Sequence, residues 1–300
     1  MLGSIGGIFY RITVPQDLVM KLPVYLLSLT LGLVGCAVAQ PTAESPAYES
    51  LFDGETLAGW HIMQVPENHN YHAVPENFYV EDGAIHCFQL PNKKGGLLLT
   101  DRKFGDFELE LEFQSDWGCD SGVFLRCTED GKAIQILNDY LSWGTIGFVY
   151  GQGTGDYMSR PLVLYEKDGQ ILVKDNYDGV EIDKLTYAMD AETWNATFKP
   201  GEWNTLKVRC VGHEPYITTW INGEKLMEFD GTVFAGRHLR DSGKRNWDAP
   251  SSWDAEKVQR ITGNRGSIAL QLHPAGKWNR WKPGGTARYR NIHILDLDAE

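Results

Sequence analysis

The stretch Asp116-Trp-Gly-Cys-Asp-Ser-Gly-Val-Phe-Leu-Arg-Cys-Thr-Glu-Asp-Gly-Lys-Ala-Ile-Gln-Ile-Leu-Asn-Asp-Tyr140 decides the fold of this 300-residue chain. Apolar side chains alternate with other side chains on both sides of a turn signal at residues 129–132, which predicts two β-strands joined by a turn. Successive side chains of a strand point to opposite faces, so Arg126 leaves on one face and Val123 and Leu125 on the other. A cation among apolar neighbours needs a partner, which makes Arg126 a candidate functional residue.

The chain after residue 51 predicts strands almost throughout. Besides the two above, the predicted strands are residues 78–80, 84–88, 97–100, 107–113, 171–173, 205–211, 216–221, 225–229, 267–273 and 287–295. The pair Asn222–Gly223 is typical of a tight hairpin, and the best helix signal runs from Ser252, as N-cap, to Ile261. Many short strands with frequent turns predict an all-β fold of two packed antiparallel sheets, which about 250 residues can form as one domain.

The strand predicted at residues 107–113 alternates without a fault and places Glu108, Glu110 and Glu112 on one face. Such a row of carboxylates could pass for a catalytic cluster. An antiparallel sheet commonly has one face in water, however, so we interpret these glutamates as a solvated outer face.

The N-terminal 39 residues predict an export segment. Met20 and Lys21 begin a short positive region, and the apolar run at 22–32 is too short to span a membrane. The following Leu33-Val-Gly-Cys36 is typical of a bacterial lipoprotein signal, in which Cys36 is lipidated and becomes the mature N-terminus. Cleavage after Ala39 is the alternative. Either interpretation predicts an exported protein, in the periplasm or at the cell surface, whose only membrane contact is the lipid on Cys36.

Residues 40–50 predict a flexible polar tether, and residues 51–300 a single globular domain. The formal net charge of −12 and the pI near 5.1 lack the basic footprint of a nucleic-acid-binding protein. The glycine-rich run 151–155 has neither the spacing nor the following helix of a dinucleotide-binding loop, so we expect a flexible rim loop and no nucleotide cofactor.

Four cysteines remain once Cys36 is assigned to lipid, and none has the Cys-x-x-Cys spacing of a zinc or redox site. A disulfide between Cys119 and Cys127 is one interpretation in an exported protein. A buried free thiol at Cys127, on an apolar strand face, is the interpretation that we favour.

Seven segments, in chain order, resemble the 3-keto-disaccharide hydrolase family. They are residues 51–60, 118–126, 134–140, 200–204, 217–223, 266–273 and 289–294. The resemblance implies a concanavalin-like jelly-roll sandwich with a concave sheet that faces a sugar. It also implies an enzyme that acts on a 3-keto-glycoside, whose ketone a separate sugar 3-dehydrogenase would supply.

Strand alternation suggests which side chains face that sugar. In residues 267–273 the apolar side chains take the core and leave Gln271 and His273 on the other face, and in residues 216–222 Trp220 lies on the polar and aromatic face. Trp278 follows His273 in a loop, and sugar rings stack on such side chains. The candidate substrate-binding residues are Asp120, Gln135, Tyr140, Trp220, Gln271 and Trp278.

Glycosidases of the jelly-roll type carry two carboxylates on alternate strand residues. This chain has Ala133, Gln135 and Asn138 at the comparable place, so that pair is missing from the expected positions. Asp139 supplies the missing carboxylate if a bulge at the strand end re-aims it.

A 3-keto sugar allows cleavage without such a pair. The ketone acidifies the hydrogen on C2, so one base can remove it, and the resulting enediolate expels the C1 substituent before water adds. His273 is the natural base near neutral pH, and Arg126 or a divalent cation would hold the developing oxyanion. Asp120, Asp139, Gln135 and His273 offer donor atoms suited to Ca, Mn or Zn, but no spacing identifies a metal.

Two functions from different classes therefore follow from the sequence. The first is an enzyme that cleaves 3-keto-glycosides by elimination and hydration, or by direct hydrolysis. The second is a lectin-like carbohydrate-binding lipoprotein that keeps the sheet but has lost the chemistry, in line with Ala133 and Asn138.

Replacement of Cys36 by Ala tests the lipid anchor. Without the thiol no lipid can be attached, so we expect the variant to move from the membrane fraction to the soluble fraction after cell fractionation. A wild-type protein that is already fully soluble would support cleavage after Ala39 instead.

Overall fold

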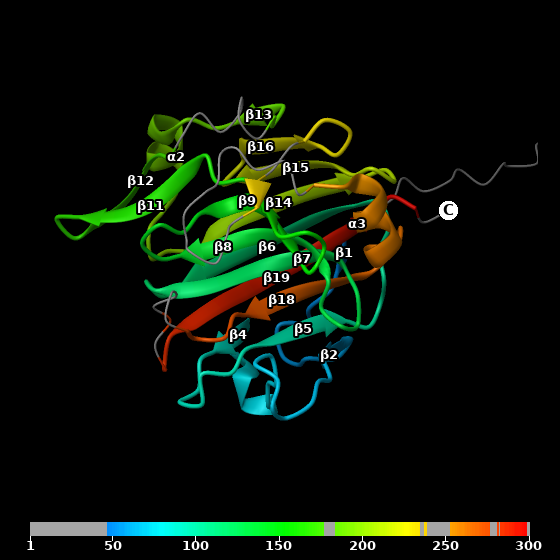
Figure 1. Cartoon of the computed structure of the whole chain (residues 1–300). Coiled ribbons are helices and arrows are strands. Elements are labelled where there is room, and N and C mark those ends of the chain that lie inside the picture. Colours follow the sequence, from blue (N-terminus) through cyan, green and yellow to red (C-terminus); the bar gives the residue numbers. More distant parts are fainter. Residues whose placement is uncertain are drawn as a thin grey trace, which may run out of the picture. The chain divides into compact units, whose positions relative to one another are not determined.

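The alternating segments form two antiparallel β-sheets in a computed structural model that describes residues 47–176, 184–234, 237–238, 253–276, 281 and 283–298. Among these residues, a nine-stranded sheet, sheet A, faces an eight-stranded sheet, sheet B (Figure 1). This arrangement confirms the predicted all-β sandwich. The predicted signal segment with Cys36, residues 40–46 of the predicted tether, and Trp278 lie outside the described residues.

Sheet A contains, in spatial order, β13 (Tyr187–Ala188), β16 (Glu224–Asp230), β15 (Tyr216–Ile221), β14 (Asn204–Val211), β6 (Phe107–Ser115), β19 (Thr286–Asp296), β4 (Ala84–Phe88) and β3 (Phe78–Glu81), and β1 (Glu49–Ser50) pairs with β19. Sheet B contains β17 (Arg237–His238), β10 (Tyr157–Met158), β9 (Ile146–Gln152), β8 (Ala133–Tyr140), β7 (Cys119–Cys127), β18 (Ser267–Leu272), β5 (Gly96–Thr100) and β2 (Trp60–Ile62). A separate hairpin joins β11 (Leu162–Lys167) to β12 (Gln170–Asp175), and the helices are η1 (Pro75–Asn77), α2 (Ala191–Thr197) and α3 (Ala255–Thr262).

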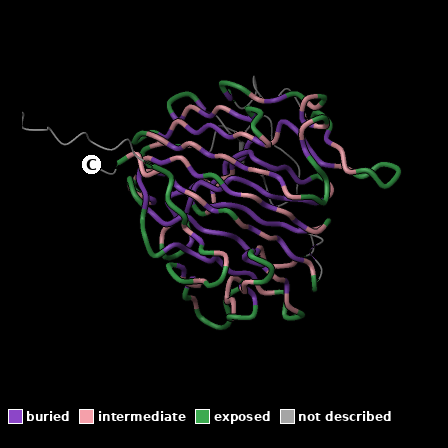
Figure 2. The backbone as a smooth tube through the Cα atoms, turned by 180° about the vertical axis from the view of Figure 1, so that it is seen from behind, coloured by how far each residue is buried: buried purple, intermediate pink, exposed green. Residues whose placement is uncertain are grey.

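The core lies between the two sheets, where the inward side chains of the central strands are mostly apolar and buried. Buried residues run along the middle of the strands (Figure 2). Strand β6 contributes Phe107, Leu109, Leu111 and Phe113, and β18 contributes Ile268, Leu270 and Leu272. Each fully buried side chain of this size stabilises the fold by roughly 1.5–3 kcal/mol. The period-two pattern of the sequence thus determines which face of each strand enters the core.

The outer face of sheet A carries the glutamates of β6, as predicted. Glu108 pairs with Lys207 at 2.7 Å and with Arg209 at 3.3 Å, and no catalytic group joins this row. Trp220 lies on the same outer face, opposite Lys207 in the β14–β15 register and with the Lys207 ammonium 5.6 Å from its ring. Trp220 therefore does not share a face with Gln271 and His273, because β15 belongs to sheet A and β18 to sheet B, and its contact with substrate stays a prediction.

The structure differs from the sequence-based prediction in several segments. The strand predicted at residues 171–173 is part of β12, but β9 and β11 went unpredicted, and so did α2, whose N-cap Asp190 accepts a hydrogen bond from the Thr193 amide. Residues 49–50, predicted as tether, form β1 on the edge of sheet A. Helix α3 begins after Asp254, whose side chain caps it, so the prediction of Ser252 as the N-cap is wrong.

The run 151–155 is not a free rim loop: its first residues end β9, and Thr154 is buried with its hydroxyl bonded to the Ala133 carbonyl. Cys87, Cys119, Cys127 and Cys210 are all buried free thiols, which confirms the favoured interpretation of Cys127. No helix among the described residues is long and apolar enough to cross a membrane.

Arg126 ties the end of β7 to sheet A rather than facing the sugar side. Its backbone is left-handed, with φ of 50°, beside a β-bulge in the β7–β18 pairing. The guanidinium is buried and donates hydrogen bonds to the carbonyls of Gly105 and Gly212, at 2.9 Å each, and to the Asp106 carboxylate at 2.8 Å. All three partners flank strands of sheet A, so the prediction that Arg126 shares a face with Gln135 and His273 is wrong.

Replacement of Arg126 by Ala should destabilise the fold and spare the chemistry. The change removes the donors of two backbone carbonyls and the partner of Asp106, so we expect a loss of about 2 kcal/mol in the free energy of unfolding. Chemical denaturation measures it, with the surface residue Arg209→Ala as a control expected to change stability by less than about 0.5 kcal/mol. A variant that keeps its stability but loses activity would return Arg126 to the active site.

Candidate active site

Three neighbouring strands of sheet B carry one row of side chains each on the face that points away from sheet A. Strand β7 contributes Asp120, Gly122 and Phe124; β8 contributes Ala133, Gln135, Leu137 and Asp139; and β18 contributes Ala269 and Gln271, continued by His273. The side chains between them in sequence, such as Val123, Ile136 and Leu270, belong to the core between the sheets. We call this outward side the open face of sheet B.

Asp139 reaches the open face by plain alternation. Asn138 points the other way, into the space between the sheets, where its amide donates to the Tyr289 hydroxyl at 3.1 Å and to the Ser115 hydroxyl at 3.2 Å. The irregularity near this point lies in the pairing of β8 with β9, between Ile136 and Asn138. Asp139 therefore needs no bulge to reach the open face. The residue to compare with a catalytic carboxylate is Asp139, one position after Asn138.

Asp120 and Asp139 are cross-strand partners in the β7–β8 register and are both buried, at 3% and 6% exposure. Burial raises the pKa of Asp139 well above its usual range, and the nearby Asp120 carboxylate, by its charge and by a hydrogen bond between the two acids, raises it further. The Arg160 guanidinium, 3.9 Å from Asp139 Oδ2, opposes this shift only in part. Asp139 is therefore an acid that keeps its proton to a higher pH than an exposed carboxyl would.

One oxygen of Asp139, Oδ1, lacks a partner within the described part of the chain. Among the residues that the structure describes, this oxygen is buried and has no hydrogen-bond partner. A buried polar atom without a partner is costly, and a bound molecule can supply that partner.

His273 lies beside this pair at the end of β18. Its amide donates to the Asp120 carbonyl at 3.2 Å, which extends the β7–β18 pairing by one residue. The ring Nδ1 lies 2.9 Å from the Pro274 carbonyl, and because a carbonyl only accepts, Nδ1 carries the proton and Nε2 is the basic nitrogen of the neutral ring. Burial lowers the pKa of His273, so the ring is neutral near pH 7. Asp120, Asp139 and His273 are called the acid–histidine cluster below.

Two buried amides adjoin the cluster and connect to a residue that the sequence analysis missed. Gln135 Nε2 donates to Gln271 Oε1 at 2.8 Å, and Gln271 Nε2 donates to the Tyr71 hydroxyl at 3.1 Å. Tyr71 in turn packs edge-on against the His273 ring at 5.8 Å. Its hydroxyl accepts from Gln271 and so keeps its own proton to donate, and burial raises its pKa, which keeps it protonated. Gln135 and Gln271 are called the amide pair.

Only a polar and aromatic run in the sequence, Asn68-His-Asn-Tyr71, could have drawn attention to Tyr71. Of the predicted residues, the structure brings together Asp120, Asp139, His273, Gln135 and Gln271. Tyr140 does not join them, because its ring points to the opposite face of β8 and packs against Trp117 and Phe198. Tyr140 therefore does not share a face with Asp139, and its contact with substrate stays a prediction.

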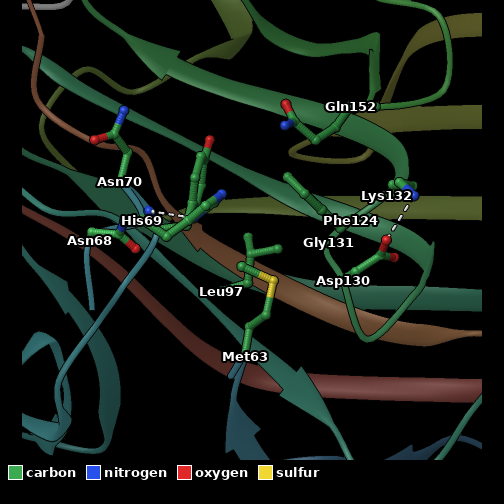
Figure 3. A pocket seen from close by; sticks show the side chains of 12 residues that line it. Met63, Asn68, His69, Asn70, Leu97, Phe124, Asp130, Gly131, Lys132 and Gln152 are labelled. Carbon is green, nitrogen blue, oxygen red and sulfur yellow. Dashed lines mark hydrogen bonds and ion pairs between the residues drawn. The ribbon is translucent and has the colours of Figure 1, made fainter. Parts of the chain in front are cut away.

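Two cavities flank Tyr71. The first, of about 500 Å³, is lined by Met63, Leu97 and Phe124 together with residues 68–71, 130–132 and 152–153 (Figure 3). The second, of about 340 Å³, is lined by His273, Pro274 and residues 92–94, and by Asn70 and Tyr71 as well. Asn70 and Tyr71 line both cavities, so the two cavities adjoin at these residues.

The donor set for a metal is weak. Within the described part of the chain, no group of three or more His, Cys, Asp and Glu side chains is arranged to hold a metal ion. Nδ1 of His273 is engaged by the Pro274 carbonyl, so only its Nε2 could bind a metal.

The 3-keto-alpha-glucoside-1,2-lyase-like domain family matches residues 47–295, and the chain belongs to this family. It is 23% identical over 272 residues to a 3-keto-disaccharide hydrolase of Bacteroides thetaiotaomicron, with 86% of this chain and 81% of that protein covered. Among solved structures, it is similar to a Parabacteroides distasonis protein provisionally described as a glycosyl hydrolase, at TM-score 0.47 and 18% identity, with 84% and 94% of the two chains covered. It is also similar to a Bacillus licheniformis β-glucanase, at TM-score 0.39 and 11% identity, with 84% and 98% covered.

Replacement of Asp139 by Asn should lower the activity of the protein and raise its stability at neutral pH. Asn cannot donate an acid proton, so we expect substrate cleavage to slow by about 100-fold or more. Because the folded-state pKa of Asp139 is raised, wild type carries no penalty below the unfolded pKa near 3.9 and loses stability as the pH rises through the folded value. The variant should therefore be more stable than wild type at pH 7, and the two should converge below about pH 4.

Chemical denaturation of both proteins from pH 4 to pH 8 measures that difference. Glu110→Gln on the exposed face of β6 is the matched change of a carboxylate to an amide, and it should alter neither activity nor the pH profile. A wild type more stable than Asp139→Asn at pH 7 would mean that Asp139 is ionised in the fold.

Proposed function

We propose that this protein cleaves 3-keto-glycosides by removing the C2 proton, eliminating the C1 substituent and hydrating the product. The chain belongs to an enzyme family of 3-keto-glycoside lyases and hydrolases. The observation that carries the mechanism is the meeting of a proton-holding acid, Asp139, and a neutral base, His273, at one end of the open face. Elimination needs both groups at once.

In the first step, Nε2 of His273 takes the proton from C2, and the electron pair moves into the C2–C3 bond to give an enediolate. The C1–O bond then breaks as a double bond forms between C1 and C2, and Asp139 gives its proton to the departing oxygen. Water next adds its oxygen to C1 and gives one proton to the Asp139 carboxylate, while C2 regains a proton from the histidinium, so both groups return to their starting states. The net reaction is hydrolysis, and the balance needs no external oxidant or reductant.

Tyr71 and the amide pair are suited to hold the sugar through these steps. The Tyr71 hydroxyl retains a proton to donate, so it is the group best placed to stabilise negative charge on the C3 oxygen, the role first given to Arg126. The amide pair fixes the Tyr71 hydroxyl through its hydrogen bond from Gln271. Each of these groups is neutral, so bringing the site out of water costs less than burying fixed charges.

The ketone must be made before this enzyme acts, because the chain has no nucleotide-binding loop among its sequence motifs. We propose that a separate sugar 3-dehydrogenase supplies it, and that the protein works outside the cytoplasm on a lipid anchor at Cys36. A divalent cation stays a prediction of the sequence.

The lectin-like alternative is not favoured. A protein that only binds sugar gains nothing from burying two acids against each other, which destabilises the fold as the pH rises. This alternative was suggested by Asn138, which stands where a catalytic carboxylate was expected. On the open face of sheet B, that place in the β8 row is filled by Asp139.

Replacement of His273 by Ala tests elimination directly. We expect loss of both aglycone release and exchange of the C2 hydrogen with deuterated solvent, measured by NMR on a 3-keto-glucoside, while thermal unfolding shows an intact fold. His293→Ala is the matched control, because Nδ1 of His293 also lies 2.9 Å from a backbone carbonyl but on sheet A. Both activities should survive in that control.

Exchange that persists in His273→Ala would move the base to Asp120 or Asp139. Aglycone release by wild type without C2 exchange or an unsaturated intermediate would favour direct hydrolysis. The unoxidised glycoside serves as the negative substrate, and the same assay with a chelator tests the need for a metal.

A further inference from the structure

The open face of sheet B changes character along its strands. The acid–histidine cluster occupies one end, and the amide pair follows. Beyond the amides, the rows continue with side chains that form a separate apolar cluster outside the main core: Met63, Leu97, Leu99, Phe124, Cys127, Ala133 and Ala269. Phe124 lies four residues from Asp120 on β7, which is about 13 Å along an extended strand. The face is therefore long enough for a sugar and one further ring.

The 500 Å³ cavity lies over this apolar cluster. Met63, Leu97 and Phe124 form its apolar floor, while Asn68, Asn70 and Gln152 place amides around it (Figure 3). The cavity adjoins the acid–histidine cluster through Tyr71, which lines it and also contacts His273. A substrate with its sugar at the cluster can thus extend its C1 substituent past the amide pair into this space.

The chemistry of the lining selects the substituent. The floor offers no polar atom to a hydroxyl group, and a hydroxyl buried there without a partner would cost free energy. The cation on the rim is already paired, because Lys132 lies 2.7 Å from Asp130, so the rim does not attract an anion. A neutral flat ring with polar groups at its edge would cover the floor and still reach the amides.

We propose that this cavity is the leaving-group subsite and that it takes an aglycone with a neutral apolar ring, so that the preferred substrates are 3-keto-glycosides of aromatic alcohols. The inference rests on the proposed function, because it assigns the C1 substituent of that reaction to the cavity. It adds the substrate class, which the family of 3-keto-glycoside enzymes leaves open.

Benzyl and methyl 3-keto-glucosides of one anomeric configuration provide the test. Both release an alcohol, so the ratio of their kcat/KM values reports mainly the ring rather than leaving-group chemistry. We expect wild type to favour the benzyl substrate by about 10-fold or more, the scale at which apolar pockets discriminate. A 3-keto disaccharide is tested in the same assay. If the enzyme prefers it to the benzyl substrate, the proposal is overturned in favour of a subsite for a second sugar.

Met63→Gln places an amide of similar size in the floor and should lower the benzyl-to-methyl ratio by about 10-fold. Activity on the methyl substrate, which leaves the cavity empty, shows that the variant is folded. Met158→Gln is the matched control, because Met158 has the same 5% exposure as Met63 but does not line the cavity, and it should leave the ratio unchanged. An unchanged ratio in Met63→Gln would overturn the subsite.

Calorimetric binding of the unoxidised benzyl and methyl glucosides separates this inference from the proposed function. If neither 3-keto-glucoside is cleaved while benzyl glucoside binds more tightly than methyl glucoside, and Met63→Gln removes the difference, the proposed function fails and the subsite stands. Equal binding of the two glucosides, together with equal cleavage of the two 3-keto-glucosides, overturns the subsite and leaves the proposed function intact.

Discussion

The site depends on one constraint: Asp120 and Asp139 face each other across two paired strands where water cannot solvate both. Two buried carboxylates in contact cannot both ionise near neutral pH, so one of them keeps a proton. The raised pKa of Asp139 is the expression of that constraint. An acid with a raised pKa thus arises from strand register and burial alone, and this is the property that the proposed reaction uses.

Holding two acids together in this way costs stability, and the sandwich supplies it elsewhere. The main core between the sheets is mostly apolar, and polar groups within it are hydrogen-bonded: the Tyr289 hydroxyl contacts both the Ser121 hydroxyl at 2.7 Å and the Asn138 amide nitrogen at 3.1 Å. This bond network lies directly behind Asp120 and Asp139 on the same strands, so it fixes the backbone that carries the acids. At the other end of β7, the hydrogen bonds of Arg126 also hold the strand in place.

Most of the groups around the acids are neutral, and the Arg160 guanidinium, 3.9 Å from Asp139, is a cation beside them. His273 has a lowered pKa, Tyr71 a raised one, and the amide pair carries no charge. In the proposed reaction these neutral groups would stabilise an enediolate by moving protons and by hydrogen bonding. The gradation from acids to amides to an apolar floor then follows the strands, because each row advances two residues at a time.

The sequence by itself determined the sandwich, the core face of most strands, the solvated glutamates of β6, and the placement of Gln271 and His273 opposite the core, because period-two alternation is a local property that any strand must obey. It also marked Asp120, Gln135 and Asp139 as a site. The tertiary structure decided which sheet each strand joins, and this separated Trp220 from the open face of sheet B. Arg126 and Tyr140 are also separated from that face, Arg126 by its hydrogen-bond partners and Tyr140 by its inward ring. The tertiary structure alone brought Tyr71 to Gln271, 200 residues away in the chain, and raised the pKa of Asp139. Hydrogen-bond partners and desolvation depend on which distant segments pack together, and the alternation within one strand does not predict this.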